Sequence, residues 1–238
     1  MAGIVQKGNM GPRLETVRNM IRNVPDLSCL ADIGCDHGKL TCAMLEENED
    51  LRAIATDISG PSLEKAKTLA EKMGLTDRIS FRLGDGLTVL RPGEADAVCF
   101  CGMGGELIRD CIEGNIEVAR NKSRFICQPM RGIEELREYL FSEGFRMLDD
   151  RMVQENGKWY QVFSCVFNGE QDAVPACFPA GFYSVGHLAF SLRDPGLKEY
   201  TSVRLDELGR QMEQARNTRG EAALAGQIEN YKTILERW

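Results

Sequence analysis

The sequence predicts an α/β protein with a mostly parallel sheet, an antiparallel edge hairpin and a C-terminal helical hairpin resembling a short coiled coil. Short apolar runs alternate with helical patterns over residues 14–144, which is typical of a parallel sheet covered by helices. Two strand-like runs then flank the tight-turn pair Asn156-Gly157. Near the C-terminus, apolar residues recur every three or four positions. We expect two domains, residues 1–168 and residues 180–238.

Composition indicates a soluble globular protein. The chain has 238 residues, 43% hydrophobic and 27% charged, with a net charge of −7. No apolar run approaches the length of a membrane span, and the N-terminus has no secretory signal. We therefore expect a cytoplasmic protein with no membrane contact. The acidic balance argues against broad nucleic-acid binding, although it allows a local basic patch.

The nine cysteines predict neither disulfides nor a metal site. Five of them, Cys29, Cys99, Cys101, Cys127 and Cys165, fall in predicted strands, where a free thiol packs as a small hydrophobe. No C-x-x-C spacing occurs, and the chain has two histidines. We expect reduced, buried thiols and no structural metal.

The first half of the chain predicts three strands behind an N-terminal helix, and a further helix follows each of the first two strands. Pro12 and Pro25 bracket that helix, whose apolar residues recur at helical spacing. Strands are expected at residues 29–32, 53–57 and 78–83. Ser59-Gly60-Pro61 begins the helix after the second strand, and Gly74 ends it.

The second half predicts a central strand at residues 97–101, because this run is almost entirely apolar. A helix is expected at 106–113, a fifth strand at 125–127, and a further helix that ends before Gly144. The edge hairpin is expected from strands at 145–153 and 159–167.

A connector is expected at residues 167–179, followed by the helical hairpin. Asp194-Pro195 predicts the start of its first helix, with Asp194 as the N-cap. Residues 217–220 break the apolar pattern between the two helices. Each helix offers only two or three heptads, so the pair must pack on the α/β domain or on a partner, such as a second copy of the chain.

The stretch Leu30–Leu40 predicts a ligand-binding turn between a strand and a helix. Gly34 and Gly38 bracket the turn, so backbone N–H groups can approach a ligand. Asp32 and Asp36 make it acidic, which suits a cationic group such as the methionine end of S-adenosylmethionine (SAM). The alternative is a plain turn in which Asp36 caps the helix.

Candidate ligand-binding motifs also follow the next three predicted strands. Asp57 has the position of a carboxylate that binds ribose hydroxyls in nucleotide-binding α/β folds. Asp85, within Gly84-Asp85-Gly86, is placed to reach an adenine amine, or else is part of an ordinary turn. Gly102-Met103-Gly104-Gly105 favours the approach of a bulky ligand over the alternative, close packing of helix and strand.

Together these motifs resemble Rossmann-like class I SAM-dependent methyltransferases. More narrowly, Ala31–Gly38, Gly84–Leu87, Gly102–Gly105 and Gln128-Pro129 resemble the bacterial tRNA adenine-22 N1-methyltransferase family. The likeness covers nearly the whole chain. The chain differs from the usual family pattern at Cys35, Lys39, Thr41 and Met130, and it carries Asp57 where Glu is common.

The resemblance implies methyl transfer from SAM to N1 of adenine 22 in tRNA. The ring nitrogen attacks the methyl group in line, so alignment matters more than a strong base. The product ring is cationic. The implied catalytic residues are Asp36, which would stabilise that charge, and His37, which would have an orienting role. The implied cofactor-binding residues are Asp32, Gly34, Cys35, Asp57, Ile58, Gly84, Asp85, Gly86, Gly102, Met103 and Gly104. The implied substrate-binding residues are Arg13, Gln128 and Pro129.

Two alternatives remain open at this stage. One is a SAM-dependent methyltransferase that acts on a small molecule, which the acidic composition favours. The other is a non-catalytic SAM-binding module that uses its helical hairpin for protein association. A nicotinamide dehydrogenase is disfavoured because the first loop lacks G-x-G-x-x-G.

Overall fold

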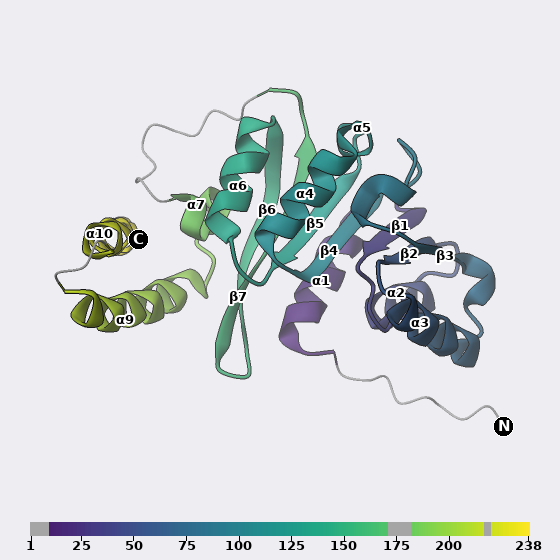
Figure 1. Ribbon diagram of the computed structural model, residues 1–238, viewed down its shortest axis with the longest axis horizontal. Coiled ribbons are helices and arrows are strands. Elements are labelled where there is room, and N and C mark those ends of the chain that lie inside the picture. Colours follow the sequence, from purple (N-terminus) through teal and green to yellow (C-terminus); the bar gives the residue numbers. More distant parts are fainter. Residues whose placement is uncertain (1–9, 171–181, 217–219) are drawn as a thin grey trace.

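The seven-stranded sheet of the computed structural model has the order β3-β2-β1-β4-β5-β7-β6, and helices cover both of its faces (Figure 1). The structure describes residues 10–170, 182–216 and 220–238. The strands are β1 Cys29–Ile33, β2 Arg52–Asp57, β3 Ile79–Leu83, β4 Ala97–Met103, β5 Arg124–Pro129, β6 Phe145–Glu155 and β7 Lys158–Phe167. The α-helices are α1 Pro12–Arg22, α2 Lys39–Glu47, α3 Gly60–Met73, α4 Gly105–Gly114, α5 Ile116–Ala119, α6 Ile133–Ser142, α7 Phe182–Val185, α8 His187–Ser191, α9 Leu197–Ala215 and α10 Glu221–Arg237. Two short 3-10 helices are η1 Thr76–Arg78 and η2 Gly86–Val89.

The sheet confirms the predicted fold class. Strands β1 to β5 are parallel, and β7 pairs antiparallel with both β5 and β6. The hairpin turns at Asn156-Gly157, as the sequence predicts. The strand order reverses between β1 and β4. In open α/β sheets, ligands bind in the crevice outside the carboxyl ends of the strands at such a point.

Each face of the sheet has its own apolar core, because alternate strand residues point to opposite sides. On one face, α1, α2 and α3 pack on residues that include Leu30, Ala55 and Cys99. On the other, α4, α5 and α6 pack on residues that include Ile33, Phe100 and Phe125. Because helices cover both faces, the inner parallel strands are almost continuously apolar. This burial explains why the apolar run at residues 97–101 predicts a central strand.

The C-terminal helices α9 and α10 form the predicted hairpin and pack on the hairpin end of the sheet. A third apolar cluster joins them to Met152 of β6 and Trp159 of β7. Tyr200 of α9 also accepts a hydrogen bond of 2.9 Å from the amide of Gln161 on β7. The hairpin therefore buries its seam partly against its own chain.

The predicted start of the first C-terminal helix is wrong by two residues. The helix begins at Leu197, and its N-cap is Gly196. Asp194 does not cap it, because its carboxylate accepts a hydrogen bond from the Gly196 amide at 2.9 Å and lies 3.9 Å from Arg151 of β6. The two short helices α7 and α8 precede this point and were not predicted. Most of the predicted connector and of the break at 217–220 lies outside the described residues.

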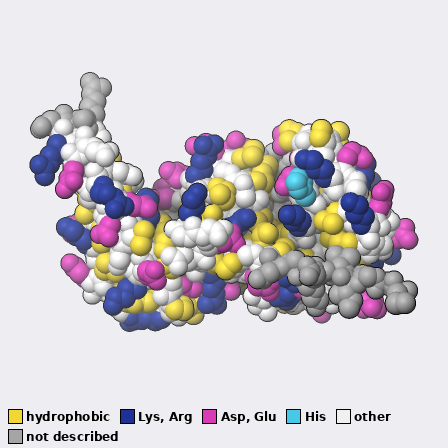
Figure 2. Space-filling model, turned by 90° about the horizontal axis from the view of Figure 1, so that it is seen from below, with side chains coloured by type: hydrophobic (Ala, Val, Ile, Leu, Met, Phe, Trp, Pro, Cys, Tyr) yellow, Lys and Arg dark blue, Asp and Glu magenta, His cyan; other side chains and the backbone are white. Residues whose placement is uncertain are grey.

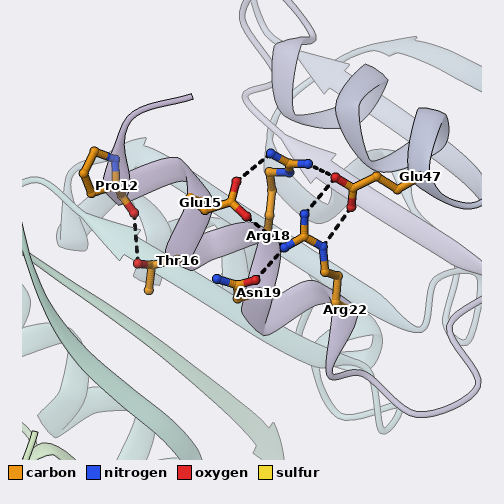
Figure 3. Close-up of polar contacts among 7 residues, drawn as sticks. All are labelled: Pro12, Glu15, Thr16, Arg18, Asn19, Arg22 and Glu47. Carbon is orange, nitrogen blue, oxygen red and sulfur yellow. Dashed lines mark hydrogen bonds and ion pairs between the residues drawn. The ribbon is translucent and has the colours of Figure 1, made fainter. Parts of the chain in front are cut away.

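Ion pairs attach the N-terminal helix α1 to α2 (Figure 3). The guanidinium of Arg22 contacts both carboxylate oxygens of Glu47, at 2.8 and 2.7 Å, and that of Arg18 also pairs with Glu47. Glu15 joins the two arginines within α1. These contacts hold the last turns of α1 against the C-terminal end of α2, while Arg13 and Leu14 at the start of α1 lie near the glycine turn.

None of the described helices is long and apolar enough to cross a membrane.

Candidate functional site

A pocket of about 370 Å³ opens at the carboxyl edge of the sheet, where β1 and β4 lie side by side. It brings together eight of the residues predicted for the site. These are Arg13, Asp32, Gly34, Cys35, Asp36, His37, Gly102 and Met103. Leu14, Lys39, Leu40 and Cys101 complete its lining.

Hydrogen bonds to a carboxylate of the neighbouring strand fix the backbone of the first glycine turn. Asp57, at the end of β2, accepts hydrogen bonds from the backbone N–H groups of Asp36 at 3.0 Å and Ser59 at 2.8 Å. The Asp36 side chain is left 71% exposed, and one of its oxygens lies 3.6 Å from Nε2 of His37. The alternative role of Asp36 as a helix cap is wrong, because the N-cap of α2 is Gly38 and no side chain caps that helix.

Asp32 lies at the base of the pocket and is almost fully buried. Its carboxylate accepts a hydrogen bond of 2.6 Å from Thr41 of α2. Burial raises the pKa of Asp32 to about 6, although the Thr41 hydrogen bond opposes that shift. The carboxyl group therefore changes its charge close to neutral pH.

A second part of the site follows β2 and β3. Their ends are joined by a hydrogen bond of 3.1 Å from Gly84 N to Asp57 O. Two apolar side chains stand exposed here, Ile58 at 73% and Leu83 at 63%. Asp85 is also exposed, whereas Gly86 is buried against Cys111 of α4. An apolar surface beside carboxylates is the chemistry that a nucleoside requires, because its base is flat and its hydroxyl and amino groups are donors.

The glycine cluster at the end of β4 is closely packed at one end and open at the other. A Cβ atom on Gly105 would lie 2.0 Å from the backbone oxygen of Gly132, so this glycine is required by close packing. Around Gly102, in contrast, a Cβ atom would meet nothing within 4 Å. Gly104 lies against the Arg131 side chain. Only the Gly102 end of the cluster faces open space in the pocket.

The ends of β4 and β5 are held together by Gln128. Its side chain is fully buried, and Oε1 accepts hydrogen bonds from Gly102 N at 3.1 Å and from Arg13 at 2.5 Å. Its amide nitrogen donates to Pro129 O at 3.1 Å. These protein groups occupy the amide of Gln128, and Pro129 is buried as well. Direct contact of either residue with a substrate stays a prediction.

Arg13 reaches this cluster from α1 and links it to the tip of the edge hairpin. Its guanidinium lies 3.5 Å from Glu155 of β6 and 5.4 Å from the ring centre of Tyr160 of β7. Arg13 of α1, which lines the pocket, therefore contacts β5, β6 and β7 as well as Cys101 of β4.

The thiols near the pocket are not nucleophiles. Burial raises the pKa of Cys101 to about 12 and also raises that of Cys35, so both stay protonated at neutral pH. Among residues 10–170, 182–216 and 220–238, no three His, Cys, Asp or Glu side chains are grouped to hold a metal ion.

Sequence reasoning did not predict the hydrogen bond between Thr41 and Asp32, and it missed Glu155 and Tyr160 as neighbours of Arg13. Thr41 is nine residues from Asp32, and its position in the first turn of the helix that follows the glycine turn was the available signal. Glu155 is 142 residues from Arg13, and nothing in the sequence pairs the two.

Comparison with known proteins agrees with this geometry. Residues 10–163 match the family model described as a methyltransferase domain. The chain is 38% identical over 164 residues to the tRNA (adenine(22)-N(1))-methyltransferase of Bacillus subtilis, covering 69% of this chain and 67% of that protein. It is 27% identical over 157 residues to a putative tRNA methyltransferase of Mycoplasma pneumoniae, covering 65% and 70% of the two chains.

Solved structures extend the similarity to the C-terminal helices. The crystal structure of the B. subtilis m1A22 tRNA methyltransferase TrmK superposes with a TM-score of 0.82 at 30% identity, covering 95% of this chain and 98% of that one. A Streptococcus pneumoniae structure in complex with S-adenosyl-L-methionine shares the fold, with a TM-score of 0.79 at 24% identity over 94% and 98% of the two chains. The chain belongs to the methyltransferase-domain proteins and, within them, to the tRNA (adenine(22)-N(1))-methyltransferase family.

Proposed function

We propose that this protein transfers the methyl group of SAM to N1 of adenine 22 in tRNA. The observation that carries the proposal is the 38% identity to the B. subtilis enzyme named for this reaction. The pocket at the strand-order reversal supports it, because acidic, glycine and apolar residues meet there. The cytoplasm, where tRNA is modified, is the location that we expect.

The residues around the pocket fit SAM. Asp57 is placed to accept hydrogen bonds from the ribose hydroxyls, because each of its oxygens has a second lone pair beside the backbone bond it accepts. Ile58 offers an apolar surface to the adenine ring, and Asp85 offers its carboxylate to the exocyclic amine. Gly34, Cys35 and Gly102 leave room for the methionine part, and Asp32 supplies a negative charge beside it. When bound, SAM supplies an electrophilic methyl group on a cationic sulfur.

Asp36 is the residue that we assign to charge stabilisation. Its exposed carboxylate stands at the mouth of the pocket, where the target ring must enter, and it favours the positive charge that develops on that ring. His37 is placed to orient this carboxylate. No residue needs to remove a proton before the reaction, because N1 of adenine already has a free lone pair.

Arg13 and Gln128 have positioning roles in this proposal. Gln128 fixes the backbone of Gly102, and Arg13 ties Gln128 to the edge hairpin. Together they hold the ends of β4 and β5 in one arrangement, and preorganisation of this kind lowers the cost of aligning the reacting atoms.

The proposal is tested by SAM binding followed by methyl transfer. Calorimetry should detect SAM binding by the unchanged protein and a clear loss of affinity in Asp57→Ala, with the fold checked by circular dichroism. Radiolabelled methyl groups should then pass from SAM to bulk tRNA. SAM binding with no transfer to tRNA would favour a small-molecule substrate, and absence of SAM binding would contradict the proposal altogether.

A further inference from the structure

A second hollow lies directly beside the candidate active site, between the start of α2 and the exposed face of α3. Its volume is about 420 Å³, and we name it the α3 groove after the helix that supplies Glu64, Lys65 and Lys72 to its wall. His37 and Lys39 line both the groove and the active-site pocket, so the two hollows are adjacent.

The groove is basic in a protein that is acidic as a whole. Lys39, Lys65 and Lys72 are exposed, and none of them pairs with a carboxylate of the described residues. The one acidic residue in its lining, Glu64, is paired with Lys67 at 2.5 Å. In Figure 2, several Lys and Arg side chains lie at the end of the molecule where α2 and α3 lie, with Asp and Glu side chains beside them, and further Lys and Arg side chains lie over the rest of this face.

The groove is also built against the turn that carries Asp36. Gly38 has a left-handed backbone conformation, with φ at +67°, and a Cβ atom there would lie 2.9 Å from that of Ala66 in α3. Lys65, the residue before Ala66 in α3, lines the groove together with His37 and Lys39, which also line the pocket. Lys65 and Lys72 are two helical turns apart, about 10 Å along the axis. That distance spans more than a single anionic group.

We propose that the α3 groove holds the phosphate backbone of the tRNA next to the adenine that is methylated. This inference rests on the proposed function. A base inside a folded tRNA must leave its stack to reach the pocket, which brings its flanking phosphates to the pocket mouth, where the groove begins. Three unpaired lysines favour a polyanion and disfavour the cationic end of SAM.

Salt dependence of tRNA binding tests the groove, because each phosphate contact contributes to the slope of log Kd against log salt concentration. The test variant is Lys65→Gln with Lys72→Gln; Lys39 is left unchanged because it also lines the active-site pocket. The matched control is Arg91→Gln with Lys122→Gln. It removes the same charge from exposed positions just before β4 and β5, at the opposite edge of the sheet.

The unchanged protein and both variants are compared with a tRNA transcript. We expect the test variant to bind tRNA roughly tenfold more weakly at low salt, with a slope smaller by about 1.4–1.8. The control should keep the original slope, and SAM affinity should be unchanged in both. Each single variant should lower the slope by about half as much, which keeps the test valid if the double variant folds poorly.

Two outcomes distinguish failure of the groove proposal from failure of the proposed function. If the unchanged protein methylates tRNA but the test variant keeps the original slope, or if test and control lose the same amount, the groove proposal is overturned while the proposed function stands. If the unchanged protein neither binds nor methylates tRNA, the proposed function fails, and the groove proposal fails with it.

Discussion

At the residue scale, the proposed chemistry depends most on Asp36. Its backbone N–H is anchored by Asp57, while its carboxylate is exposed beside His37. We predict that Asp36→Asn lowers kcat by roughly 100-fold, because the variant keeps the shape and loses the charge. Affinity for SAM should change much less. Steady-state kinetics and calorimetry measure the two quantities, and comparable losses in both would reassign Asp36 to cofactor binding.

The raised pKa of Asp32 leads us to expect that SAM binding depends on pH. Its pKa is raised to about 6 by burial, so the free protein carries a neutral carboxyl group below that pH. The cationic end of SAM favours the carboxylate, so affinity should fall as the pH is lowered from 7 to 5. Asp32→Asn should remove most of this dependence. A variant with the same pH profile as the unchanged protein would exclude Asp32 as its source.

The raised pKa of Asp32 also makes the free energy of unfolding depend on pH. Between about pH 4 and pH 6 the folded protein holds a proton on Asp32 that the unfolded chain releases. The contribution of Asp32 to stability therefore declines as the pH rises through this window and is constant above it.

The sequence predicts site residues well where strand ends bring them together. Asp32, Asp36 and Gly102 meet in one pocket because β1 and β4 are parallel neighbours, and carboxyl ends of parallel strands share an edge. The contact between Arg13 and Gln128 was not predictable, because it depends on how α1 packs across the sheet and the two residues are 115 positions apart.

At the element scale, a buried ion pair joins α6 to the edge hairpin. Arg137 of α6 lies 2.7 Å from Asp150 of β6, and neither side chain is exposed to solvent. Arg137 also donates to Gln161 of β7 at 2.6 Å and to Tyr183 O of α7 at 2.9 Å. One guanidinium thus connects the sheet to the segment that leads into the C-terminal hairpin.

Removal of Asp150 should therefore be costly. We predict that Asp150→Ala lowers the free energy of unfolding by about 3–5 kcal/mol, because Arg137 is left buried without its counter-charge. Asp149→Ala is the matched control on the same strand. Its partner Arg151 is 42% exposed, so its loss should cost about 1 kcal/mol or less. Urea denaturation measures both, and equal effects would contradict the role given to the buried pair.

The ends of helices were predictable where a local sequence pattern determines them. The Ser59 cap and Gly74 end of α3 are local signals, and both are confirmed: the Ser59 side chain accepts a hydrogen bond from Ser62 N, and Gly74 has a left-handed conformation. The start of α9 was mispredicted because the tertiary contact of Asp194 with Arg151 outweighs its local preference to cap a helix. Helices as short as α7 have too few residues to show a period.

At the scale of the whole molecule, the C-terminal hairpin of α9 and α10 lies at the opposite end from α2 and α3 (Figure 1). A folded tRNA that contacts both ends would be gripped on either side of the pocket. Of the arginines in this hairpin, Arg204 is paired with Glu207, whereas Arg210 and Arg216 are exposed. Arg219 lies outside the described residues. Association of two copies of the chain through this hairpin stays a prediction.

We predict that Arg210→Glu with Arg216→Glu weakens tRNA binding roughly tenfold, because two candidate phosphate contacts become repulsive. Affinity for SAM should be unchanged, since the hairpin is remote from the pocket. Arg91→Glu with Lys122→Glu controls for the change in net charge. Equal tRNA affinity in the hairpin variant and the unchanged protein would show that the hairpin serves only to cover the sheet end or to associate with a partner.

The central claim is methylation of N1 at adenine 22, and mapping the modified nucleotide tests it most directly. A tRNA transcript is incubated with the protein and SAM, digested, and analysed by mass spectrometry for 1-methyladenosine at each position. The account predicts 1-methyladenosine at position 22 and none in a transcript that carries guanine there. Methylation at another position or another atom, or methylation that persists in the guanine-22 transcript, would contradict it.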